Sequence, residues 1–280
     1  MSNGNQPREA LGTRMKSYEA VTDQLLASDQ PAIIRIDGHG FSKFTHGFEK
    51  PFDERIHQAM ARTSADLLTQ FPDVSLVYTQ SDEITLILPT PARSFNGRVT
   101  KLATLAASYT SVRFNFHLEE LAGDTLPSHK RGVAHFDARI FNVPSDAELL
   151  NNLIWRAKTD CRRNSISAFG RKYYSAKAMH GLKGDEVVQK VRDEHGVDFW
   201  TDAPAWARYG TTCKREVYQG TGVDGLTGKE VTMTRTRVRT EDRPWWHFTD
   251  QNVALVTARY WDTDAAGGTL AQVKEGSSED

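Results

Sequence analysis

Two short stretches constrain the fold of this chain most strongly, because each joins an apolar run to a carboxylate at a turn. Residues 33–38 read Ile-Ile-Arg-Ile-Asp-Gly, a β-branched run that ends in the Asp-Gly pair of a turn. Residues 78–83 read Tyr-Thr-Gln-Ser-Asp-Glu and lie between two apolar runs, so they predict the bend of a hairpin. If the strand lies beside the hairpin, Asp37 and Asp82 meet at one end of a sheet.

A pair of neighbouring carboxylates has a specific chemical use. Two negative charges at close range repel each other unless a cation lies between them. Mg²⁺ suits such oxygen ligands, since it takes one or two carboxylates and completes its shell with substrate phosphates. The pair therefore predicts a two-metal site for phosphoryl or nucleotidyl transfer. The alternative is ordinary turn chemistry, in which Asp-Gly ends a strand and Ser-Asp-Glu forms a solvated bend.

The composition describes an ordinary soluble protein of one large domain or two small ones. The chain has 280 residues, of which 39% are hydrophobic and 25% are charged, with a net charge of −1. No apolar run approaches the roughly 18 residues that span a bilayer, and no signal-peptide core is present, so we expect a cytoplasmic protein that does not enter a membrane. Cys161 and Cys213 lack Cys-x-x-Cys spacing and imply neither a zinc site nor a disulfide framework.

The apolar spacing predicts an alternation of helices and strands over the first half of the chain. The predicted elements are an amphipathic helix over 11–26, the strand ending at Asp37, a helix over 52–71, the hairpin over 74–88, a helix over 96–121 and a strand over 134–143. The apolar stripe expected to face the core on the last helix is Leu102, Leu105, Tyr109, Val112 and Phe116. This order gives a βαββαβ arrangement, an α+β fold with helices on one face of an antiparallel sheet.

Two further features of this half favour an anionic ligand. In the loop Gly38-His39-Gly40-Phe41, two glycines allow backbone N–H groups to approach a ligand closely, although the loop can equally be a tight turn anchored by Phe41. Arg98 and Lys101 share a face near a helix start that has no Asp or Glu nearby. Cations are disfavoured there unless an anion binds; the alternative is a pair of solvated surface cations.

The segment from residue 155 to residue 192 is strongly basic. It holds ten Lys or Arg against three Asp or Glu, and four aromatic residues are interleaved with them: Trp155, Phe169, Tyr173 and Tyr174. Basic residues with aromatics are typical of nucleic-acid binding, since the cations neutralise phosphates and flat rings stack on bases. The alternative is a helical pair with a solvated basic face and its aromatics in the core.

Beyond this segment, residues 218–240 predict a second hairpin. Three arginines at period two share one face of its return strand: Arg235, Arg237 and Arg239. They form either a stripe that follows phosphates or charges that protect an edge strand from pairing. Three later aromatics are expected to dock on the core: Trp245, Trp246 and Phe248.

Several motifs together resemble the tRNA-His guanylyltransferase family of 3′-to-5′ polymerases. They are Arg35-Ile36-Asp37-Gly38, Phe41 with Phe44, Lys50-Pro51, Ser81-Asp82-Glu83, Arg98 with Lys101, and Phe136-Asp137-x-Arg139. The resemblance covers most of residues 11–216, and the six ordered motifs are far more specific than any one of them.

The resemblance implies a polymerase-type palm related to nucleotidyl cyclases and a reaction at the 5′ end of tRNA. The RNA 5′-monophosphate would be activated by a nucleotide triphosphate, and the 3′-hydroxyl of an incoming nucleotide, preferably GTP, would then attack. The implied cofactors are two Mg²⁺ ions, and the implied substrates are ATP and GTP. The implied assembly is a homotetramer. The predicted divisions of the chain are a disordered N-terminus (1–10), the catalytic palm (11–145), a basic helical segment packed on it (146–216), a hairpin with an aromatic segment (217–264) and a disordered tail (265–280).

The resemblance also implies residue roles. Catalysis falls to Asp37, Asp82 and Glu83, and metal binding to Asp37, Gly38 and Asp82. The implied nucleotide contacts are Gly38, His39, Gly40, Phe41, Lys50, Ser81, Arg98 and Lys101. The RNA contacts that we expect are Arg139, Arg162, Arg163, Asn164, Lys172, Lys177, Arg235, Arg237 and Arg239.

Two departures bear on the branch of the family. Residues 162–165 read Arg-Arg-Asn-Ser where the eukaryotic enzymes carry His-Ile-Asn-Asn, and His39 replaces a commoner arginine. Residues 174–177 (Tyr-Ser-Ala-Lys) and the pair His180-Gly181 look more like the guanylyltransferase-like branch, which repairs truncated tRNA 5′ ends on a template. Two other functions stay open: a cyclase-like enzyme acting on free nucleotides, which needs no basic RNA surface, and a non-catalytic RNA-binding palm, which would be expected to have lost a metal carboxylate.

Overall fold

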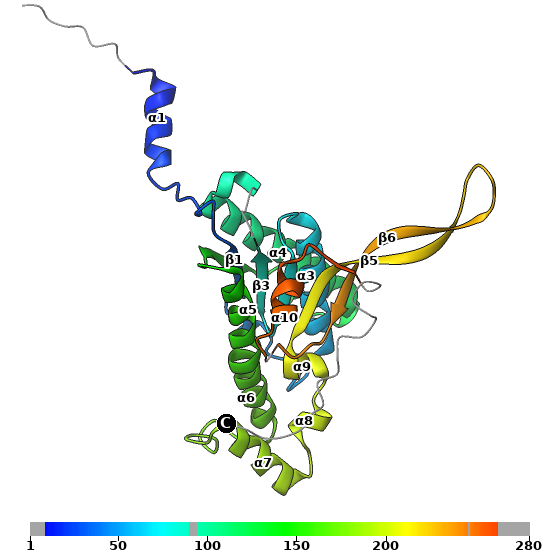
Figure 1. Ribbon diagram of the computed structural model, residues 1–280. Helices are drawn as coiled ribbons and strands as arrows, with labels where there is room; N and C mark the ends of the chain where they lie inside the picture. The colour runs from blue at the N-terminus through cyan, green and yellow to red at the C-terminus, as the bar shows by residue number, and fades with distance from the viewer. Residues whose placement is uncertain (1–8, 90–93, 246, 263–280) are drawn as a thin grey trace, which may run out of the picture.

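The computed structural model describes residues 9–89, 94–245 and 247–262. A central sheet is covered by helices on both faces, a long hairpin extends on one side and the helix α1 projects on the other (Figure 1). The disorder that we predict for 1–10 and 265–280 falls outside the described residues, except at positions 9 and 10. Within the described ranges, every helix is too short or too polar to cross a membrane.

One sheet contains all the strands of the described ranges, in the order β4-β1-β3-β2-β5-β6, with β7 beside β5. The strands are β1 (Ala32–Gly38), β2 (Leu76–Gln80), β3 (Glu83–Leu88), β4 (Phe136–Asn142), β5 (Thr211–Val223), β6 (Glu230–Glu241) and β7 (Tyr260–Asp262). Neighbours are antiparallel apart from β5 and β7. The predicted α+β palm is confirmed: β1, β2, β3 and β4 are connected through helices in the βαββαβ order.

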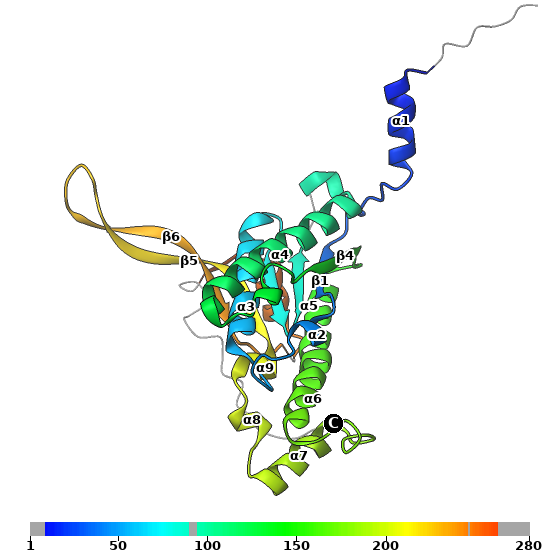
Figure 2. The ribbon, with the colours of Figure 1, turned by 180° about the vertical axis from the view of Figure 1, so that it is seen from behind.

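The helices α3 (Glu54–Gln70) and α4 (Val99–Ala122) pack on one face of this sheet, as Figure 2 shows from behind. The Asp53 side chain caps α3 by accepting a hydrogen bond from the Arg55 N–H. The predicted core stripe of α4 is partly wrong. Val112 and Phe116 are exposed, while the buried stripe is Leu102, Ala106, Thr110, Phe114 and Leu118. Small side chains on this stripe allow α4 to approach its neighbours closely, which apolar spacing alone does not reveal.

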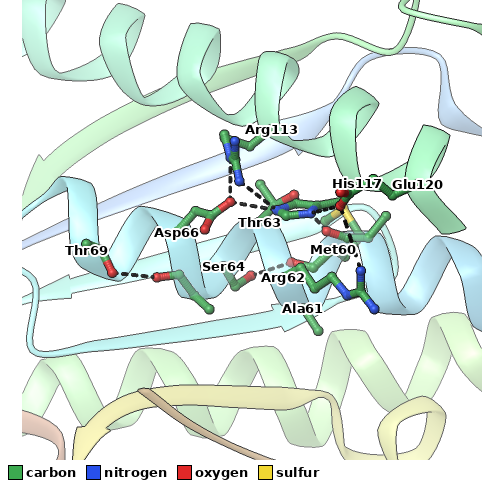
Figure 3. Close-up of polar contacts among 12 residues, drawn as sticks. Met60, Ala61, Arg62, Thr63, Ser64, Asp66, Thr69, Arg113, His117 and Glu120 are labelled. Atoms are coloured by element: carbon green, nitrogen blue, oxygen red, sulfur yellow. Dashed lines mark hydrogen bonds and ion pairs between the residues drawn. The ribbon is translucent and has the colours of Figure 1, made fainter. Parts of the chain in front are cut away.

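A polar cluster binds α3 to α4 (Figure 3). The Asp66 carboxylate accepts a hydrogen bond of 2.5 Å from Arg113 Nε and lies 2.6 Å from His117 Nε2. Glu120 lies 3.5 Å from His117 Nδ1, and Arg62 lies 3.9 Å from Glu120. The cluster therefore fixes how the two helices lie against each other at the partly exposed edge of their contact.

The opposite face of the sheet is covered by α5 (Asp146–Trp155) and α10 (Asp250–Thr257). Ile33 and Tyr78 of the sheet pack there against leucines of α5 and against Trp245. Helices thus cover both faces, because the chain after β4 returns to the side that the palm helices leave open. The expected docking of the late aromatics holds for buried Trp245 and is wrong for exposed Phe248, while Trp246 lies outside the described residues.

The N-terminal helix differs from its prediction. α1 (Leu11–Ala20) stops well before residue 26, and all its residues are exposed as it projects from the body (Figures 1 and 2). Residues 24–26 instead bind the turn before α4: the Leu26 N–H donates to the Gly97 carbonyl at 2.9 Å, and Leu25 forms a bridge with Arg98. Tertiary hydrogen bonds therefore take up the residues that would extend the helix.

The second predicted hairpin is confirmed as β5 and β6, but it starts earlier because β5 pairs with β2 from Thr211. Lys214 on β5 is only 3% exposed. Its amine donates to the carbonyls of Ser75, at 3.0 Å, and Ala258. Burial, together with the smaller effect of the nearby Arg215 charge, lowers the pKa of Lys214 from 10.5 to about 7.

This lysine predicts how stability depends on pH. The unfolded chain keeps the ordinary pKa, so between about pH 7 and 10 it binds more protons at Lys214 than the folded protein does. Stability should therefore rise with pH in that window, by up to about 1.4 kcal/mol per unit. Urea unfolding at pH 7, 8 and 9 should show this slope in the wild type and a flatter one in Lys214→Met; parallel curves would contradict the assignment.

Candidate active site

The register of the sheet brings the two motifs together at the end of β1. Asp37 lies opposite Glu83 on β3 and opposite Asp137 on β4. The Gly38 N–H donates to the Asp82 carbonyl at 3.0 Å, which ties the hairpin turn to the end of β1. The sequence prediction that Asp37 and Asp82 meet at one end of the sheet therefore holds.

The hairpin turn holds Asp82 in an environment that penalises its negative charge. Ser81 has a positive φ of 51°, and its hydroxyl donates to Asp82 Oδ1 at 2.9 Å. Burial raises the pKa of the Asp82 carboxyl, the Ser81 hydrogen bond opposes that rise, and the charge of Asp37 adds to it. Two carboxylates that disfavour each other's charge gain free energy when a cation binds between them.

The donor set fits Mg²⁺ better than zinc. In the described part of the chain, no three His, Cys, Asp or Glu side chains converge as a metal site. The predicted ligands are two carboxylates, Asp37 and Asp82, and the Gly38 carbonyl. A structural or catalytic zinc site needs three or four side-chain ligands, whereas Mg²⁺ is commonly held by one or two carboxylates together with substrate phosphates.

The loop after β1 is a tight turn anchored in the core. A Cβ on Gly38 would lie 2.3 Å from the Phe41 ring, so only glycine lets that ring close over the strand end. Gly40 has a φ of 65° and precedes the short helix α2 (Phe41–Phe44). His39 is exposed and stacks on His135, with 4.9 Å between ring centroids. Phe41 is buried, so its side chain belongs to the core. Contact of a nucleotide with this loop, through the backbone of Gly38, Gly40 and Phe41 and through His39, stays a prediction.

Lys50, the next predicted nucleotide contact, is exposed. It lies close enough to Lys130 to lower that residue's pKa, after the larger effect of burial. Lys130 in turn donates to the carbonyls of Phe44 and His46 and so fixes the segment after α2.

Within one chain, Arg98 and Lys101 lie at the other end of the sheet from Asp37, and their contact with a nucleotide stays a prediction. α4 begins at Val99, with Arg98 as its N-cap, and its first turn has no acidic residue. Arg98 pairs with Leu25, close to where Ala27 hydrogen-bonds the Asn142 side chain. Asn142 pairs with the first residue of β1, so Asp37 lies roughly 17 Å further along the sheet.

Glu83 has partners on both of its oxygens, which favours a positioning role over direct catalysis. Gln80 Nε2 donates to Glu83 Oε2 at 2.6 Å, and Arg156 forms an ion pair with the same oxygen. Arg35 Nη2 lies 3.9 Å from Oε1 and 3.6 Å from the Asp37 carboxylate. Four polar residues in this region are not among the predicted site residues: Arg35, Gln80, Asp137 and Arg156. Two of them could have been found from the sequence. Arg35 is a charge within an apolar run, and Asp137 lies in the family motif Phe136-Asp137-x-Arg139.

The basic segment folds into helices below the sheet. They are α5, the π-helical turn Arg156–Cys161, α6 (Arg162–Tyr173), α7 (Gly184–His195), α8 (Phe199–Asp202) and α9 (Ala205–Tyr209). Phe169 is buried against Val191 and Phe199, so for this aromatic the core alternative is right, whereas Trp155 is half exposed.

The predicted RNA-binding residues divide into three groups. Arg139 is exposed on β4 directly opposite Arg35, close to the carboxylate pair. On and after α6, exposed positions are Arg163, Asn164, Lys172 and Lys177, while Arg162 is half buried and binds Asp185. On β6, Arg237 and Arg239 both bind buried Glu216, so they neutralise a carboxylate inside the hairpin, and only Arg235 of the three is left as exposed charge outside that cluster.

Comparisons with known proteins point to one family. The profile of the family described as tRNAHis guanylyltransferase matches residues 12–144. An uncharacterized protein of Acanthamoeba polyphaga mimivirus is 36% identical over 75% of this chain and 78% of its own length. The tRNA(His) guanylyltransferase of Debaryomyces hansenii is 29% identical over 63% of this chain and 65% of its own length.

Two solved structures are similar over most of their length. A bacterial tRNA(His) guanylyltransferase-like protein in complex with ATP has a TM-score of 0.66 and 31% identity, with 73% of this chain and 88% of that chain covered. One in complex with GTP has a TM-score of 0.64 and 26% identity, with 89% and 98% covered.

The fold and the carboxylate pair at the end of β1 define a palm-type nucleotidyltransferase. Sequence identity above 30% with a solved relative, over most of that relative's length, narrows the class further. The chain belongs to the tRNA(His) guanylyltransferase family.

The start of α4 generates a prediction that is independent of activity. Lys101 is exposed in the first helical turn, where the helix dipole disfavours a cation. Lys101→Glu should therefore stabilise the protein by about 0.5–1 kcal/mol, a rise of roughly 1–3 °C in melting temperature. Lys229→Glu, in the exposed hairpin loop, is the control that should change little. A lower melting temperature for Lys101→Glu would show that Lys101 has a favourable role at this helix end.

Proposed function

We propose that this chain adds nucleotides, preferably from GTP, to the 5′ end of tRNA or a tRNA-like RNA in the 3′-to-5′ direction. The observation that carries the proposal is the pair of carboxylates, Asp37 and Asp82, held together at the end of β1 in a palm-type sheet. The complexes of bacterial relatives with ATP and with GTP support nucleotide triphosphates as its substrates.

The reaction divides into two displacements at phosphorus. An oxygen of the RNA 5′-monophosphate attacks the α-phosphate of a nucleotide triphosphate, and pyrophosphate leaves. The 3′-hydroxyl of the incoming nucleotide then attacks the activated 5′-phosphate, loses its proton, and the activating nucleoside monophosphate leaves. Bound Mg²⁺ would supply charge neutralisation for the phosphates and for the attacking hydroxyl.

The residues of the chain divide these tasks. Asp37, Asp82 and the Gly38 carbonyl would hold two Mg²⁺ ions, and the exposed side chains of His39 and Lys50 would contact the triphosphate. Arg35 places positive charge 3.6 Å from Asp37, which lessens the repulsion between the Asp37 and Asp82 carboxylates.

The RNA would follow the basic helices below the sheet. Arg139 lies beside the carboxylate end of β1, and Arg163, Lys172 and Lys177 are exposed along α6 and the loop after it. This placement connects the reacting 5′ end with a surface that neutralises phosphates. Repair of truncated tRNA 5′ ends fits the Arg-Arg-Asn-Ser stretch better than dedicated addition to tRNA-His. A homo-oligomer and a cytoplasmic location remain proposals from the family resemblance.

The decisive experiment is incubation with 5′-monophosphorylated intact and 5′-truncated tRNA, ATP, GTP and Mg²⁺, followed by mapping of the 5′ ends. Extension of the truncated tRNA opposite a template base would support repair. Addition of a single untemplated G to intact tRNA-His would support the dedicated reaction. Cyclic nucleotide formation without any change to RNA would overturn the proposal in favour of a cyclase-like enzyme.

The carboxylate pair should be indispensable for this activity. Asp37→Ala or Asp82→Ala removes a predicted metal ligand, so the rate of nucleotide addition should fall by roughly 10³-fold or more. Circular dichroism and tRNA affinity should stay close to wild type. Asp193→Ala, an exposed carboxylate on α7, is the matched control with a normal rate. A variant at Asp37 or Asp82 with more than about a tenth of wild-type turnover would contradict the two-metal site.

The helical surface should determine how RNA binding depends on salt. The test variant replaces four cations by glutamine: Arg162, Arg163, Lys172 and Lys177. It should bind tRNA more weakly, and the slope of log affinity against log salt should become shallower by up to about one unit per lost phosphate contact. Four exposed cations elsewhere provide a control of equal charge: Arg14, Lys16, Arg62 and Lys229. We would measure tRNA affinity by filter binding between about 50 and 200 mM salt. Equal losses of affinity in the two variants would show that the helical segment is only a solvated basic face.

A further inference from the structure

A π-helical turn, Arg156–Cys161, joins α5 to α6 inside what would otherwise be one long helix. Such turns are rare and frequently lie at functional sites. This one holds two charged side chains in the interior, since Arg156 is 3% exposed and Asp160 is 7% exposed. Buried charges cost free energy unless they are paired, so the partners of these two residues indicate what the turn does.

Arg156 bridges two carboxylates from different parts of the chain. Its Nη2 binds Glu83 at the end of the sheet, and its Nη1 binds Asp160 within the turn. The guanidinium lies over the Trp155 ring, 4.9 Å from the centroid. Its Nε has no hydrogen-bond partner among the described residues, so the two Nη groups carry the bridge. A guanidinium offers separate N–H groups in a fixed geometry, which a lysine ammonium cannot reproduce.

Glu83 connects this bridge to the candidate metal site. Gln80 fixes Glu83 Oε2 by a hydrogen bond of 2.6 Å. Arg35 Nη2 lies 3.9 Å from Glu83 Oε1 and 3.6 Å from Asp37 Oδ2. Arg35 is thus shared between Glu83 and Asp37, the predicted metal ligand. A change at Glu83 therefore alters how the Arg35 charge interacts with Asp37.

Asp160 connects the bridge to the surface. Arg163 Nη2 donates to Asp160 Oδ1 at 2.9 Å, and the Arg163 side chain is 69% exposed on α6. Charges of alternating sign therefore run from the helical surface to the end of β1 through Arg163, Asp160, Arg156, Glu83, Arg35 and Asp37.

We propose that Arg156 is a positioning residue for nucleotide transfer, which holds Glu83 so that Arg35 and Asp37 keep the geometry that the reaction needs. The inference rests on the proposed function and adds a residue to it. Arg156 acts through Glu83 and does not itself touch the nucleotide. Displacement of a reacting group by about 1 Å can cost about 10²-fold in rate, so an indirect role of this kind has a measurable effect.

The test compares five variants with the wild type. They are Arg156→Lys, Arg156→Met, Glu83→Gln, the double variant Arg156→Met/Glu83→Gln, and the control Lys158→Met. Lys158 is exposed in the same π-helical turn, so the control removes a charge from that turn without touching the bridge. For each protein we would measure the single-turnover rate, the tRNA and GTP affinities, the melting temperature and the Mn²⁺ affinity by titration calorimetry.

Arg156→Lys should lower the single-turnover rate by about 10–100-fold while the tRNA and GTP affinities stay within about threefold. The double variant should be no slower than the slower single variant, because both changes break the same contact. Arg156→Met removes a positive charge that interacts with Asp37, so it should bind Mn²⁺ about threefold or more tightly although it reacts more slowly. Loss of folding stability alone would not tighten metal binding. Lys158→Met should match the wild type.

The proposal is overturned if Arg156→Lys reacts within about threefold of the wild-type rate, or if the Arg156 and Glu83 effects multiply in the double variant. Arg156→Lys keeps the buried charge and carries the test if Arg156→Met does not fold. If the wild type adds no nucleotide to any tRNA, the proposed function fails. The Mn²⁺ affinities then still decide the inference, because equal values for the wild type and Arg156→Met would overturn it.

Discussion

The antiparallel pairing of β1 with β3 on one side and β4 on the other is the constraint on which the rest of the structure depends. It fixes Asp37 between Glu83 and Asp137 and places the Asp82 turn at the end of the strand. A shift of one residue would turn Arg35 and Asp37 into the α3–α4 core and remove Ile36 from it, so burial of Ile34 and Ile36 in that core enforces the register. Packing of apolar side chains therefore decides where the charges of the site lie.

Side chains along β1 alternate between the two faces of the sheet. One face is apolar, and the other carries charged side chains at one end of the strand. Ile34 and Ile36 pack against α3 and α4, whereas Arg35 and Asp37 face the side covered by α5 and the π-helical turn. Because that side is partly closed, Arg156 and Glu83 meet with little water, and each requires the other as a counter-charge. The helical segment is thus connected to the palm by ion pairs as well as by the apolar contacts of α5 with Ile33 and Tyr78.

The length of α4 explains why Arg98 and Lys101 lie far from Asp37 within the chain. Its C-terminal half packs beside the loop after β1, through contact of Phe114 with Phe41 and Phe136. Its N-terminus, with Arg98, lies at the other end of the sheet, where Leu25 and Asn142 are found. Residues that are neighbours in a motif pattern are separated here because a helix of 24 residues runs along the sheet.

The sequence by itself determined the palm strands, the hairpin around Asp82, the helices before and after it, and the meeting of Asp37 with Asp82. These features follow from local apolar periodicity and turn chemistry, and the family motifs point to the same chemistry. Only the tertiary structure decided that Val112 and Phe116 are exposed, that Arg237 and Arg239 neutralise Glu216, and that Arg156 binds Glu83. Each of these depends on a partner far away in the chain, and the charge or hydrophobicity of a residue does not specify which partner it meets.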